Sequence, residues 1–398
     1  MRAAIVALEE SQSLRGERLT SSVDTVAHTA ARHAQDVDAR ARLPVEAIGA
    51  LREQNLLAAV APRDLGGPGL SVHELAGIAR KVARSCGSTA MVWAMHQGQL
   101  ASLCRHHGGI PALVGLARTA VADQWLIASA TSEPASGGDI RKSAAALVAS
   151  SGSPGSVTLS KDATTVSYGA AADLLQVTAR RNPDVVANDQ VLVAVLQEQA
   201  ALAQRGTWSP LGMRGTSSPG FLLTATIPER QVFSDPFADI ASVTMVPLTH
   251  TLWAALWLGL ATEAVSRAVK VSRRRAAGNN GGGAAQSALG EARWRLASLE
   301  ALLADMTVRT QEFLDEGAQP TASQSVRTNA LKVAASETAL EIAHLSLRVC
   351  GMAGYSEEGP FSVARIIRDL SSAPIMINNS QLLDSTAQLM LMERQHDW

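Results

Sequence analysis

A segment rich in small and hydroxyl-bearing residues, Thr131 to Asp139, offers the first chemistry that the sequence suggests. Its order is Thr-Ser-Glu-Pro-Ala-Ser-Gly-Gly-Asp, and Gly137 and Gly138 have no side chain to keep a ligand away from the backbone. Such a segment approaches a planar or phosphorylated ligand closely. Taken alone it is only a turn, so a ligand site there needs support from motifs elsewhere in the chain.

The histidines do not form a metal-binding pattern. His106 and His107 are adjacent and therefore do not share a helix face, and we expect no carboxylate partners for either this pair or the pair His28 and His33. The chain has 3 cysteines without a CxxC spacing, which argues against both a zinc site and a disulfide framework. We therefore expect no metal and a cytoplasmic protein.

Charge and hydropathy narrow the class of partner. The 398 residues include 35 Lys and Arg against 36 Asp and Glu, scattered rather than striped, which argues against a nucleic-acid partner and favours a small neutral or anionic ligand. The N-terminus is a poor signal peptide because two glutamates interrupt its apolar run. The apolar stretch Leu252 to Ala261 has about half the length of a membrane span, so we expect a soluble chain without a membrane partner.

The hydrophobic pattern divides the chain into three parts. Helical spacing fills residues 1–126, short β-rich runs fill 127–236, and long helical periodicity returns over 237–398. This order differs from a dinucleotide-binding fold, in which strands and helices alternate. Strands are expected at 144–147, 157–159, 174–178, 191–195 and 221–227, and C-terminal helices at 249–275, 285–316, 325–353 and 376–394.

Motifs in the second half of the chain carry a resemblance to a known family. Residues 347–355 read Leu-Arg-Val-Cys-Gly-Met-Ala-Gly-Tyr, followed by Ile-Arg-Asp at 367–369 and Pro-Ile-Met-Ile-Asn-Asn at 374–379. Together with Leu-Gly-Met-Arg-Gly-Thr at 211–216, this order resembles the acyl-CoA dehydrogenase family, including its flavin-monooxygenase relatives. The resemblance implies an α+β fold with an N-terminal helical domain, a central β barrel or sandwich and a C-terminal four-helix bundle.

The resemblance also implies a flavin, FAD or alternatively reduced FMN, held without a covalent bond. The segment from Thr131 resembles the family's Thr-Glu-Pro-Gly-Ala-Gly-Ser-Asp, and residues 166–173 resemble its second flavin-contacting strand and turn. Thr165 stands where the family has tryptophan, a departure shared with the monooxygenase relatives. The residues implied to bind the cofactor are Ser129, Thr131, Ser132, Gly137, Gly138, Ser167, Arg274, Gly351, Gly354 and Asn379.

Arg274 has two interpretations. Residues 274–278 resemble the family's Arg-x-x-Phe-Gly motif, which reaches the flavin of a neighbouring subunit, although Ala277 lacks the phenyl ring. The other interpretation is a solvated basic helix end that is favoured by the helix dipole. The first interpretation implies a homotetramer or at least a homodimer.

The family's catalytic base is missing. Ile377 stands where the family often carries a catalytic glutamate, and Asn378 stands where it has glycine. Isoleucine cannot remove the α-proton of an acyl thioester. Some family members place the glutamate on the first C-terminal helix, but the matching stretch Pro247 to Trp253 has no carboxylate either. His250 is titratable and next to that position, so we name His250 and Asn378 as candidate catalytic residues, although a capping or core histidine is the commoner meaning.

Two enzymatic functions follow from these residues. The first is an FAD-dependent oxidoreductase that acts on an acyl thioester of CoA or a carrier protein and passes electrons to a partner such as electron-transfer flavoprotein. The alternative is a monooxygenase that receives reduced flavin from a flavin reductase and hydroxylates an aromatic carbon, amine or sulfur. The alternative needs no glutamate base. A non-enzymatic scaffold is less favoured because the flavin-facing serines and glycines are retained.

Overall fold

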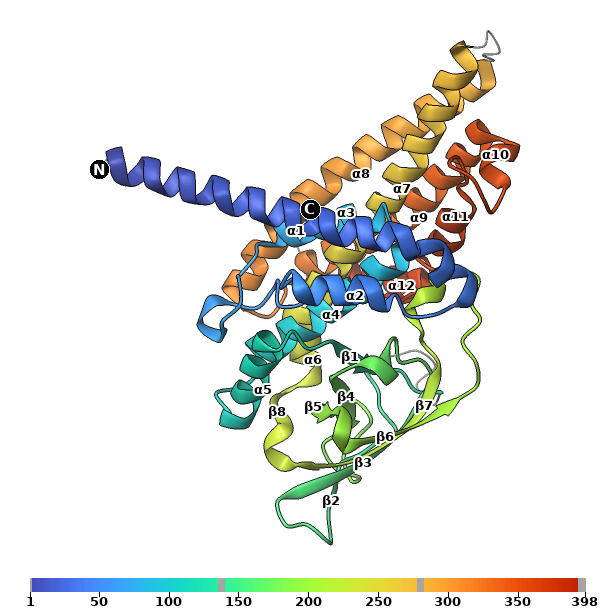
Figure 1. Ribbon diagram of the computed structural model, residues 1–398. Helices are drawn as coiled ribbons and strands as arrows, with labels where there is room; N and C mark the ends of the chain where they lie inside the picture. Colours follow the sequence, from blue (N-terminus) through green and yellow to red (C-terminus); the bar gives the residue numbers. More distant parts are fainter. Residues whose placement is uncertain (1, 135–139, 278–282, 393–398) are drawn as a thin grey trace.

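The computed structural model describes residues 2–134, 140–277 and 283–392. Helices come first, strands follow, and long helices complete the chain, as the sequence predicts (Figure 1). The strands lie at one end of the molecule, and the long C-terminal helices extend away from them. The predicted α+β fold class is therefore confirmed.

Among the N-terminal helices, α3 and α5 pack on α4, whose residues are almost all buried, and α1 packs on α2 and α3. A capping box begins α3, because the Ser71 hydroxyl accepts from the Glu74 amide while the Glu74 carboxylate accepts from the Ser71 amide at 2.7 Å. Helix α4 contacts both strand β1 and helix α7, so it joins the two halves of the molecule. The five helices are α1 (Arg2–Arg40), α2 (Val45–Glu53), α3 (Val72–Ala83), α4 (Gly87–Arg105) and α5 (Pro111–Ala122).

The central strands form two four-stranded sheets, in the orders β1-β4-β5-β8 and β2-β3-β7-β6. Strands β1 and β4 run parallel, and the other pairs are antiparallel. The predicted strand at 144–147 is wrong, since only Ala146 forms an isolated bridge there. The strands are β1 (Ile127–Ala130), β2 (Val148–Ala149), β3 (Ser156–Ala163), β4 (Leu174–Arg180), β5 (Gln190–Leu196), β6 (Ala200–Arg205), β7 (Gly220–Pro228) and β8 (Val232–Pro236).

The C-terminal helices are built around α7, which packs against α3, α8 and α9. A turn of π-helix, Ala241–Met245, precedes α7, and a capping box between Thr321 and Gln324 begins α9. The helices are α6 (Phe237–Ile240), α7 (Val246–Ala277), α8 (Gly283–Glu316), α9 (Ala322–Cys350), α10 (Met352–Tyr355), α11 (Ala364–Leu370) and α12 (Asn379–Met392). The three longest predicted helices lie within a few residues of these bounds, whereas α11 was not predicted.

One continuous helical stretch, Phe237–Ala277, is long and apolar enough to cross a membrane by composition alone. Its most apolar window has a mean hydropathy of 1.3, but 94% of that window is buried inside the protein. A helix buried on all sides in a large fold has the same composition. We therefore assign α7 as the core helix of the C-terminal bundle.

Candidate active site

The two hydroxyl-rich segments of the β region lie side by side. The Ser132 hydroxyl is 3.2 Å from the carbonyl oxygen of Thr165 and accepts from the Thr165 amide at 3.3 Å. These residues are 33 positions apart in the sequence, so the fold brings together the end of β1 and the turn after β3. Thr165, which stands in place of the family's tryptophan, therefore borders the same edge as Ser132.

Three hydroxyls near this edge have hydrogens that remain available to a ligand. Ser129 and Thr131 are half-buried, and their hydroxyls have no hydrogen-bond partner within the part of the chain that the structure describes. Ser218 donates to the Ser167 oxygen at 2.8 Å, which leaves the hydrogen of Ser167 available to donate outward. Unused donors on half-buried strand ends suit the heteroatoms of a flavin ring, so these residues fit such a group.

A buried ion pair anchors the start of the glycine-containing segment. Glu133 contacts Lys161 and accepts from the Ser143 hydroxyl at 2.5 Å. Burial alone would raise the pKa of Glu133, but Lys161 and Ser143 outweigh it and the pKa is lowered, so the carboxylate stays charged. The predicted cofactor residues Gly137 and Gly138 follow at once but lie outside the described residues.

A fully buried lysine, Lys332 of α9, holds the turn between α11 and α12. Its ammonium donates to the carbonyl oxygens of Ala373 at 3.0 Å and Ile377 at 2.7 Å, and to Oδ1 of Asn379 at 2.6 Å. Burial lowers the pKa of Lys332 to about 8, while Glu337 opposes the shift. All three ammonium hydrogens have acceptors, so the lysine is a structural clamp on the segment that carries the family's base in its relatives.

The residues of this turn have distinct roles. Ile377 has φ of 51°, a left-handed conformation that is strained for a β-branched side chain. Asn378 is exposed, and its Oδ1 accepts from the Ser380 amide at 2.9 Å, which is helix N-capping rather than chemistry. The Nδ2 of Asn379 donates to Ser336 and Glu337, both at 3.0 Å. The amide of the predicted cofactor residue Asn379 is therefore fully engaged within the protein.

His250 lies in the same region and is 1% exposed. Its ring stacks on Trp253, with centroids 5.9 Å apart, and the Lys332 ammonium lies 5.9 Å from the Trp257 ring. Burial, and then the charge of Lys332, lowers the pKa of His250 to about 4. The backbone of Thr328 acts in the opposite direction and raises the pKa of His250. Its distance and angle to the ring are not those of a hydrogen bond, and both ring nitrogens lack hydrogen-bond partners among the described residues. His250 is therefore a neutral imidazole at pH 7.

The C-terminal end of α9 is capped by an arginine next to the predicted one. Arg275 donates to the carbonyl oxygens of Val349 at 2.6 Å and Cys350 at 3.0 Å, whereas Arg274 is exposed. Gly351 has φ of 62°, and a Cβ on Gly354 would lie 2.4 Å from the Cβ of Cys350. Glycine is therefore required at both positions for the turn itself, independently of any cofactor.

A buried aspartate ties the site region together. Asp369 of α11 accepts from the Met213 amide at 2.6 Å, and a Cβ on Gly212 would lie 1.9 Å from the carbonyl oxygen of Arg368. The β-region motif at 211–216 thus packs directly on the Ile-Arg-Asp motif. Burial raises the pKa of Asp369 to about 6, and the Met213 amide opposes the shift.

Two histidines do have carboxylate partners, which corrects the expectation from the sequence. His106 contacts Asp235 through Nδ1 and Thr244 through Nε2, both at 2.8 Å, and His33 lies 3.6 Å from Glu46. These carboxylates come from other elements and are invisible in the local sequence. Over the described ranges, no group of three His, Cys, Asp or Glu side chains is placed to hold a metal ion.

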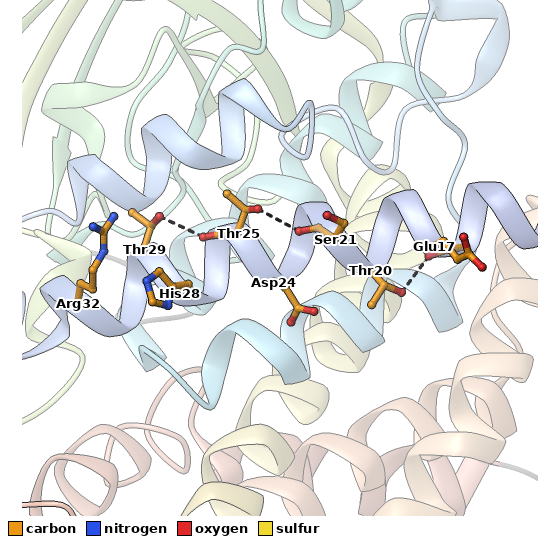
Figure 2. A pocket seen from close by; sticks show the side chains of 9 residues that line it. Glu17, Thr20, Ser21, Asp24, Thr25, His28, Thr29 and Arg32 are labelled. Carbon is orange, nitrogen blue, oxygen red and sulfur yellow. Dashed lines mark hydrogen bonds between the residues drawn. The ribbon is translucent and has the colours of Figure 1, made fainter.

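A groove of about 960 Å³ runs along α1 and shares no residue with this site. Figure 2 shows its polar lining from Glu17 to Arg32. The hydroxyls of Thr20, Thr25 and Thr29 donate to backbone carbonyls four residues earlier. These donors are used within the helix, so the groove offers no organised chemistry.

Comparison with known proteins decides the family. The family description "Acyl-CoA dehydrogenase, C-terminal domain" matches residues 242–381, and "Acyl-CoA dehydrogenase, N-terminal domain" matches residues 17–109. The chain belongs to the acyl-CoA dehydrogenase family. It is an enzyme of the flavin-dependent oxidoreductase class, as the resemblance implied.

The individual proteins that the chain is similar to are named as acyl-CoA dehydrogenases or, for TdsC, as a dibenzothiophene monooxygenase. Cyclohex-1-ene-1-carbonyl-CoA dehydrogenase of Geobacter metallireducens is 25% identical over 374 residues, covering 90% of this chain and 93% of the relative. FMN-bound TdsC from Paenibacillus sp. A11-2 superposes with a TM-score of 0.83 at 19% identity, covering 95% of this chain and 98% of TdsC. Butyryl-CoA dehydrogenase from Megasphaera elsdenii superposes with a TM-score of 0.79 at 18% identity, covering 94% of this chain and 98% of the dehydrogenase. The two structural likenesses establish the fold alone.

Three residues of the site escaped the sequence analysis: Lys332, Glu133 and Asp369. Lys332 gave a signal, since it shares a helical face with Ala335, Ala339 and Ala343, all buried. A lysine within an apolar stripe needs a buried partner. The identity of that partner, the backbone of the turn at 373–377, required the tertiary structure.

Proposed function

We propose that this member of the acyl-CoA dehydrogenase family uses reduced flavin to oxygenate a small organic substrate. The observation that carries the proposal is the chemistry around Ile377. The side chain of Ile377 cannot accept a proton, and its backbone carbonyl accepts a hydrogen bond from the Lys332 ammonium. The charge of the same ammonium also lowers the pKa of His250. Dehydrogenation of a thioester needs a base near pH 7 at this place, whereas oxygenation does not.

His250 does not repair the loss of the base. A general base is most effective when its pKa lies near the operating pH, and the pKa of His250 is lowered to about 4. At pH 7 such an imidazole is neutral, with one ring nitrogen free to accept, but it holds an added proton weakly. We assign His250 instead the role of a neutral hydrogen-bonding group toward substrate.

A bound flavin supplies two-electron redox chemistry and, when reduced, the activation of oxygen. The hydroxyls of Ser129, Thr131 and Ser167 would orient its ring, and Ser132 with Thr165 would border it. We favour FAD over FMN because residues 351–355 resemble the family segment that packs against the adenylate half of FAD. Extraction and chromatography of the bound flavin decide between the two.

The test loads the purified protein with flavin, reduces it chemically and mixes it with oxygen in a stopped-flow instrument. We expect an oxygen-dependent absorbance transient distinct from both the oxidised and the reduced cofactor. Monotonic reoxidation at the rate of free flavin contradicts the proposal. Ser132→Trp should block the ring site and abolish flavin binding, and Ser323→Trp, on the first turn of α9, serves as a matched control that should still bind.

Acyl-thioester dehydrogenation is the second candidate. Its support is the 25% identity with a protein named cyclohex-1-ene-1-carbonyl-CoA dehydrogenase over nearly the whole chain. This reading implies that electrons leave to an electron-transfer flavoprotein, whereas the oxygenase reading implies supply by a flavin reductase. Dye reduction with cyclic and straight-chain acyl-CoA substrates under anaerobic conditions distinguishes them, since an oxygenase gives no turnover in that assay.

We also propose that the protein is a cytoplasmic homotetramer, or at least a homodimer. Several large apolar side chains near the C-terminus are exposed in the single chain, which suits burial between subunits. They include Met352, Tyr355, Ile375, Leu383 and Leu391. A monomeric mass by light scattering at micromolar concentration, with flavin bound, contradicts the proposal.

A further inference from the structure

Three ring side chains on one face of α7 carry polar atoms that nothing in the described part of the protein satisfies. His250, Trp253 and Trp257 are spaced at i, i+3 and i+7, which places them on one side of the helix. Both nitrogens of His250 and the indole nitrogens of the two tryptophans are buried without a hydrogen-bond partner among the described residues. We call these three residues the donor row.

The rings of the donor row follow one another along the helix. His250 and Trp253 stack at 5.9 Å with an angle of 28° between planes, and Trp253 and Trp257 are 6.0 Å apart at 44°. Trp253 retains 6% exposure, whereas His250 and Trp257 retain 1% and 0%. All three rings are thus buried, with Trp253 in the middle of the row the most accessible, and aromatic faces and unused N–H groups lie next to each other.

Neighbouring polar groups do not serve the row. The three hydrogens of Lys332 are bound to Ala373, Ile377 and Asn379. The amide of Asn379 is bound to Lys332, Ser336 and Glu337. Because native proteins satisfy nearly all buried polar groups, a row of orphans needs an external partner. Trp93 makes the contrast clear, since its indole donates to the Leu56 carbonyl at 2.8 Å.

The chemistry of the row selects the ligand. An indole N–H only donates, and a neutral imidazole donates from one nitrogen. Two or three donors therefore face a ligand that must accept, and stacked aromatic rings favour a flat partner. A saturated acyl thioester has an acceptor only at its thioester carbonyl, and its flexible chain offers neither a flat face nor an acceptor to the rest of the row.

We propose that the donor row recognises a planar aromatic substrate that carries a carbonyl oxygen. The oxygen accepts from the indole hydrogens of Trp253 and Trp257, and the ring system stacks beside His250. That the ligand is a substrate rests on the proposed oxygenase function, whereas its binding to the donor row does not. It identifies Trp253 and Trp257 as the residues that determine specificity.

The test measures binding to the flavin-loaded protein by calorimetry with two matched probes. One is 2-acetylnaphthalene, which has the carbonyl oxygen, and the other is 2-ethylnaphthalene, which has the same ring without it. We expect the ketone to bind about 10-fold more tightly, and Trp253→Phe or Trp257→Phe each to reduce that ratio by about 3- to 10-fold, as the loss of one hydrogen bond does. Binding of the hydrocarbon should change little, because phenylalanine keeps an aromatic ring.

The matched control is Trp93→Phe, which removes a buried indole whose hydrogen is already bound and should leave the ratio unchanged. Circular dichroism confirms that each variant is folded. The proposal is overturned if the two probes bind with equal affinity, or if neither Trp253→Phe nor Trp257→Phe changes the ratio of their affinities. Water would then be the partner of the donor row. If the ketone binds selectively but no oxygen-dependent transient forms, the proposed ligand recognition stands and the proposed oxygenase function fails. Failure of the one proposal is therefore distinguishable from failure of the other.

Discussion

The ammonium of Lys332 lies 2.7 Å from the carbonyl oxygen of Ile377, the residue that stands in place of the family's catalytic glutamate. Ile377 has a left-handed backbone, which costs on the order of 1–3 kcal/mol for a residue other than glycine. A charged hydrogen bond of this kind contributes a comparable amount, about 1.5–3 kcal/mol. The buried lysine thus holds a strained turn at the centre of the candidate active site.

Lys332→Met should therefore destabilise the protein by about 2–4 kcal/mol, because it leaves the oxygens of Ala373, Ile377 and Asn379 without their donor. Chemical denaturation measures the change. Lys270→Met, at an exposed position of α7, should change stability by less than about 0.5 kcal/mol. A second readout is the pKa of His250, which should rise when the charge of Lys332 is removed. If the free energy of unfolding of Lys332→Met equals that of the wild type, Lys332 does not stabilise the turn at 373–379.

The free energy of unfolding should depend on pH through the titration of Asp369. Burial raises its pKa to about 6 from a usual value near 3.8, so the folded protein binds this proton more tightly than the unfolded chain. The stabilising contribution is complete below about pH 4 and is lost as the pH rises through about 6. A difference of about two pKa units corresponds to about 3 kcal/mol.

Asp369→Asn should remove that dependence, since the amide oxygen still accepts from Met213 and no charge develops. The free energy of unfolding of the variant relative to the wild type should rise by about 3 kcal/mol between pH 4 and pH 7. Urea unfolding at intervals of half a pH unit measures it. A constant difference across this range shows that Asp369 does not titrate there.

The close contact between the β region and α11 should tolerate no side chain at Gly212. A Cβ there would lie 1.9 Å from the Arg368 oxygen and 2.6 Å from the Asp369 nitrogen, both backbone atoms. Gly212→Ala should destabilise by more than about 3 kcal/mol and reduce the yield of soluble protein. Gly290→Ala, in the middle of α8 with open space around it, should be neutral or stabilising by about 0.5–1 kcal/mol. A wild-type melting temperature in Gly212→Ala contradicts the packing.

The three-part fold was predictable because its helices are long and its apolar residues recur at regular spacing. Helices α7, α8 and α9 each exceed 28 residues, so their periodicity is sampled over many turns. The short helix α11 has only 7 residues and gave no such signal. The run at 144–147 has strand composition, yet it pairs with the distant strand β4 only at Arg180, through an isolated bridge at Ala146.

The site was predictable only in part, for a related reason. The hydroxyls that the resemblance implies to face a flavin follow one another in short motifs, and the contact between Ser132 and Thr165 was not predicted. Lys332, by contrast, is bound to Ile377 from 45 positions away, and His106 meets Asp235 across 129 positions. Such contacts follow from how the helices pack, which no local pattern encodes. The strain at Ile377 likewise appears only in the folded backbone.

Replacement of the missing base gives the final prediction. Ile377→Glu should place a carboxylate where the family often carries its catalytic glutamate, and general-base assistance typically contributes about 10²–10⁴-fold to a rate. We expect the variant to reduce dye with acyl-CoA substrates while the wild type is weak or inactive in the same anaerobic assay. Val308→Glu, at an exposed position of α8, controls for an added charge.

Robust turnover of acyl-CoA by the wild type would contradict this expectation and indicate that another group accepts the proton. His250→Ala then decides the matter, because His250 is the buried imidazole next to the Lys332 clamp. Loss of turnover in that variant would assign the base to His250 despite its lowered pKa. The pH profile should then show full activity down to about pH 4, since a base with that pKa is unprotonated at all higher values.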